Sequence, residues 1–274
     1  MGGVAPPLTR RNMFPVELAI LLVLVAFLAG VGITTIGPGG IFVTIALFVL
    51  LPIDPAVVAG TASTTFVATG VIGSVAYARS GELRSSMAHE MAVILSVFGI
   101  MGALVGTRLN LYVSEFTFGV VLAVFVGTIG AGLLARELGF SLHRGHVRDR
   151  EGVQRVTLGL VGLVIGVAGG MLGVGGPVLA VPLLVLLGVP MLVGLAVAQV
   201  QSIFIAGFAA IGYLSVGAVS WPLVVLAGVP QVIGVVVGWR IAHLVPARLL
   251  RMLLGVVLLV LAPGIVPLGV ESLH

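Results

Sequence analysis

Long apolar runs constrain this chain more than any other feature of its sequence. Eight of them approach or exceed the ~20 residues that span ~30 Å of hydrocarbon as a helix, and few contain a charge. They are Val16–Ile36, Pro55–Ala78, Met87–Thr107, Phe116–Leu134, Val153–Leu172, Pro190–Leu214, Trp221–Gly238 and Leu249–Val266. None alternates polar and apolar residues as transmembrane β-strands do. Because a bilayer offers no water to the backbone, the runs predict an all-α polytopic membrane protein.

The composition agrees with this class and limits the partners. Only 8% of the residues are charged, against about 25% in a soluble domain, so the chain cannot cover a water-facing surface. All 13 basic residues are arginine, and they lie at the ends of apolar runs and in one loop, as membrane topology requires. The aromatic stacking surfaces of nucleic-acid binders are missing. We expect the lipid bilayer, and no nucleic acid, as a partner.

Two glycine-rich motifs, Gly37–Gly40 and Gly173–Gly176, lie 136 residues apart and indicate an internal duplication. Other matches in register are Tyr77 with Tyr213, Gly81 with Gly217 and, after a loss of four residues, Gly106–Arg108 with Gly238–Arg240. We therefore predict a first transmembrane repeat at residues 1–135 and a second at 156–274. The polar stretch 136–155 holds five arginines and three acids, which predicts a cytoplasmic linker.

Each half also has a short apolar piece after its glycines, Ile41–Leu51 and Pro177–Leu187. Such a piece rises only ~17 Å as a helix, so we predict a broken or re-entrant helix. If the pieces return to the side they entered, each half crosses four times and the halves are parallel. If they complete a crossing, each half crosses five times and the halves are inverted. The inverted arrangement places ten arginines inside and the parallel one nine, a small preference for inversion.

The glycine motifs are the first candidate binding site, with Gly37, Gly39 and Gly40 in one turn and Gly173, Gly175 and Gly176 in the other. Glycine permits close approach of a ligand to the backbone. The short helix that follows offers unpaired N–H groups and a partial positive charge, which together favour an anion. The competing interpretation is close helix packing through small residues.

Polar side chains in two apolar runs are the second candidate. They are Thr61, Ser63, Thr64 and Thr65 in the first half and Gln199, Gln201 and Ser202 in the second. Hydroxyls and amides donate hydrogen bonds to an oxyanion without carrying a charge. A threonine can equally bond its own helix backbone, whereas an unpaired glutamine is costlier. The two glutamines are therefore the sharper signal.

Arg108 and Arg240 end matching helices and could hold a sulfonate or carboxylate as guanidinium forks. Their position at helix ends favours the alternative, in which they extend to the lipid headgroups. Glu90 begins a helix and is a candidate for proton coupling, or is simply solvated. The chain has no cysteine and no HExxH or GxSxG motif, so we predict neither an enzyme nor a metal or other cofactor.

The glycine motif together with Val58–Ser63 and Tyr77–Leu83 resembles the sulfite exporter TauE/SafE family of permeases. Tyr213–Val219 and Gly102–Arg108 fit the same pattern, and the resemblance covers Phe14 to Val266. It implies export of sulfite or a small organosulfonate, such as sulfoacetate, across the bacterial cytoplasmic (inner) membrane. Some relatives are linked to other small anions.

We therefore predict a secondary transporter for a small sulfur-containing anion. Its two glycine turns would converge near mid-membrane, with Thr64, Thr65, Gln199 and Gln201 lining the pocket, and its halves would move to alternate access. The alternatives are an anion channel, for which no filter-like ring can be recognised, and a membrane enzyme or assembly subunit. A homo-oligomer is compatible with the sequence.

Overall fold

The computed structural model describes residues 15–138, 151–244 and 247–271, and throughout these ranges the protein is helical, without a strand. The helices are α1 (Val16–Thr35), η1 (Pro38–Gly40), α2 (Ile41–Leu50), α3 (Pro55–Ser80), α4 (Ser86–Asn110), α5 (Glu115–Glu137), α6 (Glu151–Leu172), α7 (Pro177–Leu186), α8 (Met191–Leu214), α9 (Trp221–Ala242) and α10 (Ala247–Glu271). Most of the predicted linker, residues 139–150, lies outside the described residues.

Seven helices of the described part are long and apolar enough to cross a membrane: α1, α3, α4, α5, α6, α8 and α9. Their outer faces are apolar as well. On α4, for example, Val93 is 61% exposed and Met101 is 55% exposed. A water-soluble helix would place polar residues on that face. The prediction of an all-α polytopic membrane protein is confirmed.

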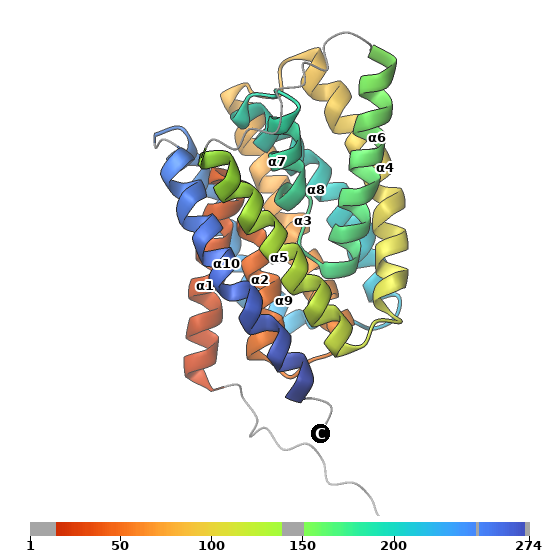
Figure 1. Ribbon diagram of the computed structural model, residues 1–274, viewed down its shortest axis with the longest axis vertical. Helices are drawn as coiled ribbons and strands as arrows, with labels where there is room; N and C mark the ends of the chain where they lie inside the picture. The colour runs from red at the N-terminus through yellow and green to blue at the C-terminus, as the bar shows by residue number, and fades with distance from the viewer. Residues whose placement is uncertain (1–14, 139–150, 245–246, 272–274) are drawn as a thin grey trace, which may run out of the picture.

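Both halves present the same order of elements: a long helix, a glycine turn, a ten-residue helix and three long helices. In Figure 1 the start of α1 and the end of α10 lie at one end of the bundle, and the end of α5 and the start of α6 lie at the other. This arrangement agrees with inverted halves, which stay a prediction. Trp239 Nε1 donates to Ser80 Oγ at 3.2 Å, so the ends of α9 and α3 lie together. The parallel alternative would separate them.

Two matching hydrogen bonds support the predicted duplication, which stays a prediction. The hydroxyl of Tyr77 on α3 donates to the carbonyl of Thr34 on α1, 43 residues earlier. The hydroxyl of Tyr213 on α8 donates to the carbonyl of Gly170 on α6, again 43 residues earlier, at 2.7 Å. Both phenol rings are fully buried. Each half thus fastens its third helix to its first with the same bond.

Helices from opposite halves pack in pairs: α1 on α9, α4 on α6, α3 on α8 and α5 on α10. Glycines bring two of these pairs very close. A Cβ added at Gly106 of α4 would lie 2.2 Å from the carbonyl oxygen of Val167 on α6. One added at Gly234 of α9 would lie 2.1 Å from the carbonyl oxygen of Phe27 on α1. Small residues permit this approach, which dispersion then stabilises.

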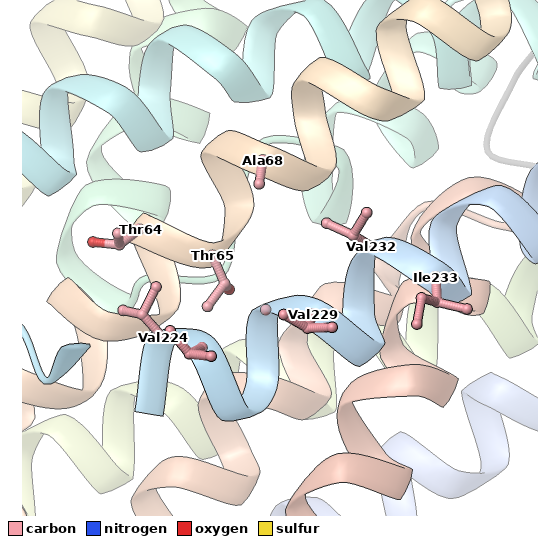
Figure 2. Close-up of a pocket in the computed structure, with 9 residues that line it drawn as sticks. Thr64, Thr65, Ala68, Val224, Val229, Val232 and Ile233 are labelled. Atoms are coloured by element: carbon pink, nitrogen blue, oxygen red, sulfur yellow. The ribbon is translucent and has the colours of Figure 1, made fainter. Parts of the chain in front are cut away.

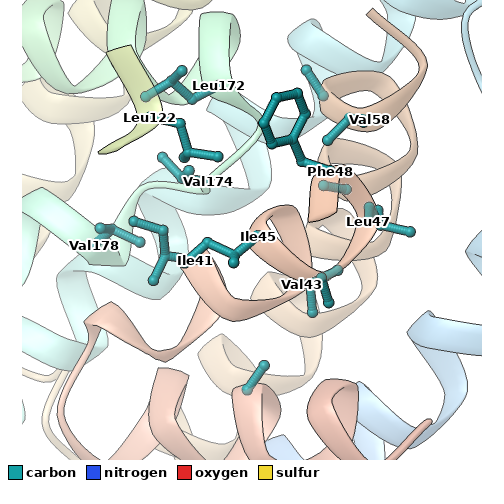
Figure 3. Close-up of a cluster of buried hydrophobic side chains, with 14 of the residues drawn as sticks. Ile41, Val43, Ile45, Leu47, Phe48, Val58, Leu122, Leu172, Val174 and Val178 are labelled. Carbon is teal, nitrogen blue, oxygen red and sulfur yellow. The ribbon is translucent and has the colours of Figure 1, made fainter. Parts of the chain in front are cut away.

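The short helices are buried inside the bundle. Figure 3 shows the side chains of Ile41 and Ile45 on α2 beside Val174, in the glycine turn before α7, and Val178, in the first turn of α7. Farther along α2, the ring of Phe48 lies 5.1 Å from that of Phe118 on α5, centroid to centroid. The ten residues of α2 are too few to cross alone, yet they form part of the core.

Candidate functional site

The two glycine turns meet at the middle of α3. A Cβ added at Gly40 would lie 2.7 Å from Cε1 of Phe66, and one added at Gly175 would lie 3.3 Å from Cγ of the same ring. Phe66 is near the midpoint of α3 and is 2% exposed. Both turns therefore contact one aromatic ring at mid-height of the bundle.

Each turn also contacts the short helix of the opposite half. A Cβ at Gly37 would lie 3.0 Å from the carbonyl oxygen of Pro177 in the first turn of α7. Thr44 Oγ1, in the first turn of α2, donates to the carbonyl oxygen of Gly173 at 2.6 Å. Sequence reasoning missed Thr44, although a lone hydroxyl in an otherwise apolar ten-residue helix was an available signal.

The second turn requires glycine for two reasons. Gly173 and Gly175 have φ of 63° and 74°, values that side chains rarely tolerate. A Cβ at Gly173 would also lie 2.6 Å from Cα of Ala59. At the end of the turn, a Cβ at Gly176 would lie 3.3 Å from the backbone nitrogen of Ser202. The N-terminus of α7, with its unpaired N–H groups, thus lies beside α8.

The two predicted glutamines extend from α8 toward different helices. Gln199 Nε2 donates to the carbonyl of Ile33, just before the first glycine turn, and Gln201 Nε2 donates to that of Leu95 on α4, both at 3.4 Å. Both residues are fully buried, and neither Oε1 has a partner in the described part of the chain. Gln199 is the closer of the two to the glycine turns, because its partner Ile33 lies four residues before Gly37.

A third glutamine, Gln231 on α9, was not selected from the sequence. It is fully buried, and neither of its amide atoms has a hydrogen-bond partner among the described residues. It follows Pro230, which lies inside the helix and cannot donate a helical hydrogen bond. An amide next to a proline in an apolar helix was a readable signal.

The three threonine hydroxyls of α3 that the sequence selected are already hydrogen-bonded. Thr61 Oγ1 accepts a hydrogen bond from the backbone N–H of Ser220 at 3.0 Å. Thr64 and Thr65 donate to the carbonyls of Gly60 and Ala62, each at 2.8 Å. Ser63 is 2% exposed.

Thr64 and Thr65 line a groove of about 370 Å³ between α3 and α9, shown in Figure 2. The other lining residues are apolar, among them Val229 and Ile233, which are 57% and 53% exposed. The groove therefore opens on the outer face of the bundle. Thr65 immediately precedes Phe66, the residue that both glycine turns contact.

The charged candidates lie at the ends of helices. Arg108 and Arg240 are exposed in the last turns of α4 and α9, which lie at opposite ends of the bundle (Figure 1). Glu90 Oε1 accepts from Arg155 Nε at 2.6 Å, with side chains 46% and 61% exposed. Such a surface ion pair contributes little to stability. The glycine turns lie near Gln199 and Ser202. The charged candidates lie apart from this group.

A bundle of membrane-crossing helices whose buried centre consists of glycine turns and broken helices defines a membrane transport protein. The family model of the sulfite exporter TauE/SafE matches residues 22–264. The chain belongs to this family of membrane transporters for sulfite and related anions. No curated protein and no solved structure matches the chain. In the described residues, no group of histidine, aspartate and glutamate side chains could hold a metal ion.

Proposed function

We propose that the protein is a secondary transporter that exports sulfite, or an organosulfonate such as sulfoacetate, across the bacterial inner membrane. The observation that carries the proposal is the convergence of both glycine turns on Phe66 in a chain of this family. The N-termini of α2 and α7 follow these turns. Helix N-termini stabilise anions through unpaired N–H groups and the helix dipole.

The binding site that we propose comprises the two glycine turns, with Gln199 and Ser202 beside them on α8. Gln231 adds an amide without a partner among the described residues. An uncharged set of donors suits a carrier, because a fixed positive charge would hold the anion and slow its release. Thr61, Thr64 and Thr65 are secondary members, because their hydroxyls are already hydrogen-bonded.

Export of an anion needs no coupling ion when the cell interior is negative. Each elementary charge that moves outward gains ~2.3 kcal/mol per 100 mV. The proposed transport is therefore downhill for a singly charged sulfonate. A proton that enters in exchange for the anion would add to this driving force, whereas a proton that leaves with it would cancel the charge moved.

The test is uptake of radiolabelled sulfite and sulfoacetate into liposomes that contain the purified protein. We expect protein-dependent, saturable flux that an imposed potential accelerates. Ser202→Val adds bulk beside the first turn of α7 and should reduce this flux at least about tenfold, a transition-state cost of ~1.4 kcal/mol. The matched control is Ser215→Ala, an exposed serine whose hydroxyl bonds only its own helix, and it should transport normally.

Three outcomes would contradict the proposal in different ways. Absence of flux for every small sulfur anion would exclude the transport function and favour an enzyme or assembly subunit. Linear, non-saturating flux with single-channel steps would indicate a channel instead of a carrier. Normal flux in Ser202→Val would remove the α7 N-terminus from the proposed site.

A further inference from the structure

A polar cluster joins the ends of α3 and α9, far along the chain from the glycine turns. His243 Nε2 lies 3.0 Å from Glu82 Oε1. Ser80 Oγ donates to Glu82 Oε2 and accepts from Trp239 Nε1. The side chain of His243 is 31% exposed and that of Glu82 is 12% exposed. The cluster is thus partly buried but open to water on the histidine side.

The geometry of His243 requires a proton between the two side chains. Its Nδ1 lies 2.8 Å from the carbonyl oxygen of Trp239. A carbonyl can only accept, so Nδ1 must carry a hydrogen. Nε2 then faces an oxygen of the Glu82 carboxyl group. A lone pair on Nε2 would repel an ionised carboxylate, and the 3.0 Å contact is stable only when one proton lies between the two atoms.

We propose that Glu82 and His243 form a proton-binding site that holds the ends of α3 and α9 together, and that loss of the proton releases them. α3 lies in the first half of the chain and α9 in the second, so the site links parts that a carrier must move relative to each other. This role rests on the proposed transport function. The proton-dependent contact itself does not.

The site lies at the end of the bundle that holds most of the described arginines. Arg79 ends α3, Arg155 begins α6, Arg240 ends α9 and Arg248 begins α10, and these helix ends lie at that end of the bundle in Figure 1. Arg84 lies in the loop that follows α3. Arginine excess marks the cytoplasmic side of a membrane protein, so the proton would come from the cytoplasm. The other groups close to the cluster are the side chain of Arg84 beside Gly81 and the ring of Tyr77, 6.1 Å from that of His243.

Electrostatics agree with this geometry. The hydrogen bond to the carbonyl of Trp239, and then the contact with Glu82, raise the pKa of His243. Burial alone would raise the pKa of Glu82, but the hydrogen bonds from Ser80 and His243 outweigh it and lower this pKa below its ordinary value. An imidazolium paired with a carboxylate is the form that both shifts favour.

The pH window follows from the directions of these shifts. The contribution of His243 is fully present below its ordinary pKa of 6.5 and is lost as pH rises through the raised pKa. The contribution of Glu82 is present above its ordinary pKa of 4.5 and is lost as pH falls through the lowered one. The contact is therefore fully formed between the ordinary pKa values of the two groups and opens as pH rises through the raised pKa of His243.

Trp239 provides a direct readout, because its ring lies 5.4 Å from that of His243 and a charged imidazole quenches indole emission. The chain has only two tryptophans, so Trp221→Phe leaves Trp239 as the sole emitter. In this background, emission should titrate with a midpoint above 6.5. Glu82→Gln should lower the midpoint by about one pH unit, and His243→Gln should abolish the titration. His89→Gln, an exposed histidine at the start of α4, should leave it unchanged.

The second arm measures anion flux in liposomes as internal pH rises from 6 to 9. We expect the pH dependence of the wild type to disappear in both Glu82→Gln and His243→Gln. An unchanged emission midpoint in Glu82→Gln would overturn the proton-binding pair. Unaltered pH dependence of flux in His243→Gln would overturn its role in transport. If no protein moves any anion, the transport function fails while the fluorescence result still decides on the pair.

Discussion

At the scale of single residues, Gln231 stands out because its buried amide has no partner in the described part of the chain. A buried polar group without a hydrogen bond costs about 1–3 kcal/mol. Gln231→Leu should therefore leave the unfolding temperature in detergent unchanged or raise it. The same change should reduce sulfite flux at least about tenfold, because it removes an amide available to a solute. Thermal unfolding and liposome flux measure the two effects separately.

The contrasting variant is Thr61→Val. Its hydroxyl accepts from the backbone N–H of Ser220, so the substitution leaves a partly buried donor unpaired and should lower stability by about 1–3 kcal/mol. A loss of stability in Gln231→Leu as large as that in Thr61→Val would mean that the amide of Gln231 makes a stabilising bond.

Thr44 makes a second residue-scale prediction. Thr44→Val keeps the shape of the side chain but removes the 2.6 Å bond from α2 to the carbonyl of Gly173. Loss of one buried hydrogen bond should cost about 1 kcal/mol, which lowers the unfolding temperature by about 2–4 °C in a chain of this size. Thr128→Val is the control, since this exposed hydroxyl bonds only its own helix and should change little.

At the scale of elements, the glycines of α4 and α6 set the distance between the two helices. Gly106→Ala would place a Cβ 2.2 Å from the carbonyl oxygen of Val167, so α4 and α6 must separate, at a cost of about 1–3 kcal/mol. Gly132→Ala on α5 is the control, because no atom lies within 4 Å of the added Cβ. It should be neutral or stabilise the helix by up to about 1 kcal/mol. Equal stability of the two variants would contradict the close packing.

The sequence predicts the positions of the helices far better than it predicts which helices pack against each other. Apolar length alone places the long helices, and both short helices end within one residue of their predicted ends, at Leu50 and Leu186. Pairing is not readable, because glycine faces on α1, α4, α6 and α9 are chemically alike. The hydroxyls of Thr64 and Thr65 were ambiguous for a similar reason: a carbonyl of the same helix competes equally for each of them.

At the scale of the whole molecule, most of the features that the sequence did not predict are contacts between residues far apart in the chain. Glu82 and His243 are 161 positions apart, and no local pattern relates them. The glycine turns were recognisable because a positive φ and a close approach both demand glycine at the same positions. Arginine counts gave only a small preference for inverted halves. The rule for sidedness adds up arginines over all loops, and the two arrangements differ by only one arginine on the inside.

The opposite direction of the halves makes the last prediction, which single cysteines can test because the chain has none of its own. Leu244→Cys follows α9 and Tyr112→Cys follows α4, at positions 81% and 88% exposed. Arg84→Cys lies in the loop between α3 and α4. In intact cells, a membrane-impermeant maleimide should label only position 112, and all three should react after permeabilisation. Labelling of position 244 together with 112 in intact cells would instead require parallel halves, with the ends of α3 and α9 on opposite sides of the membrane. The contact between Trp239 and Ser80 could not then exist, and neither could the proton site formed by Glu82 and His243.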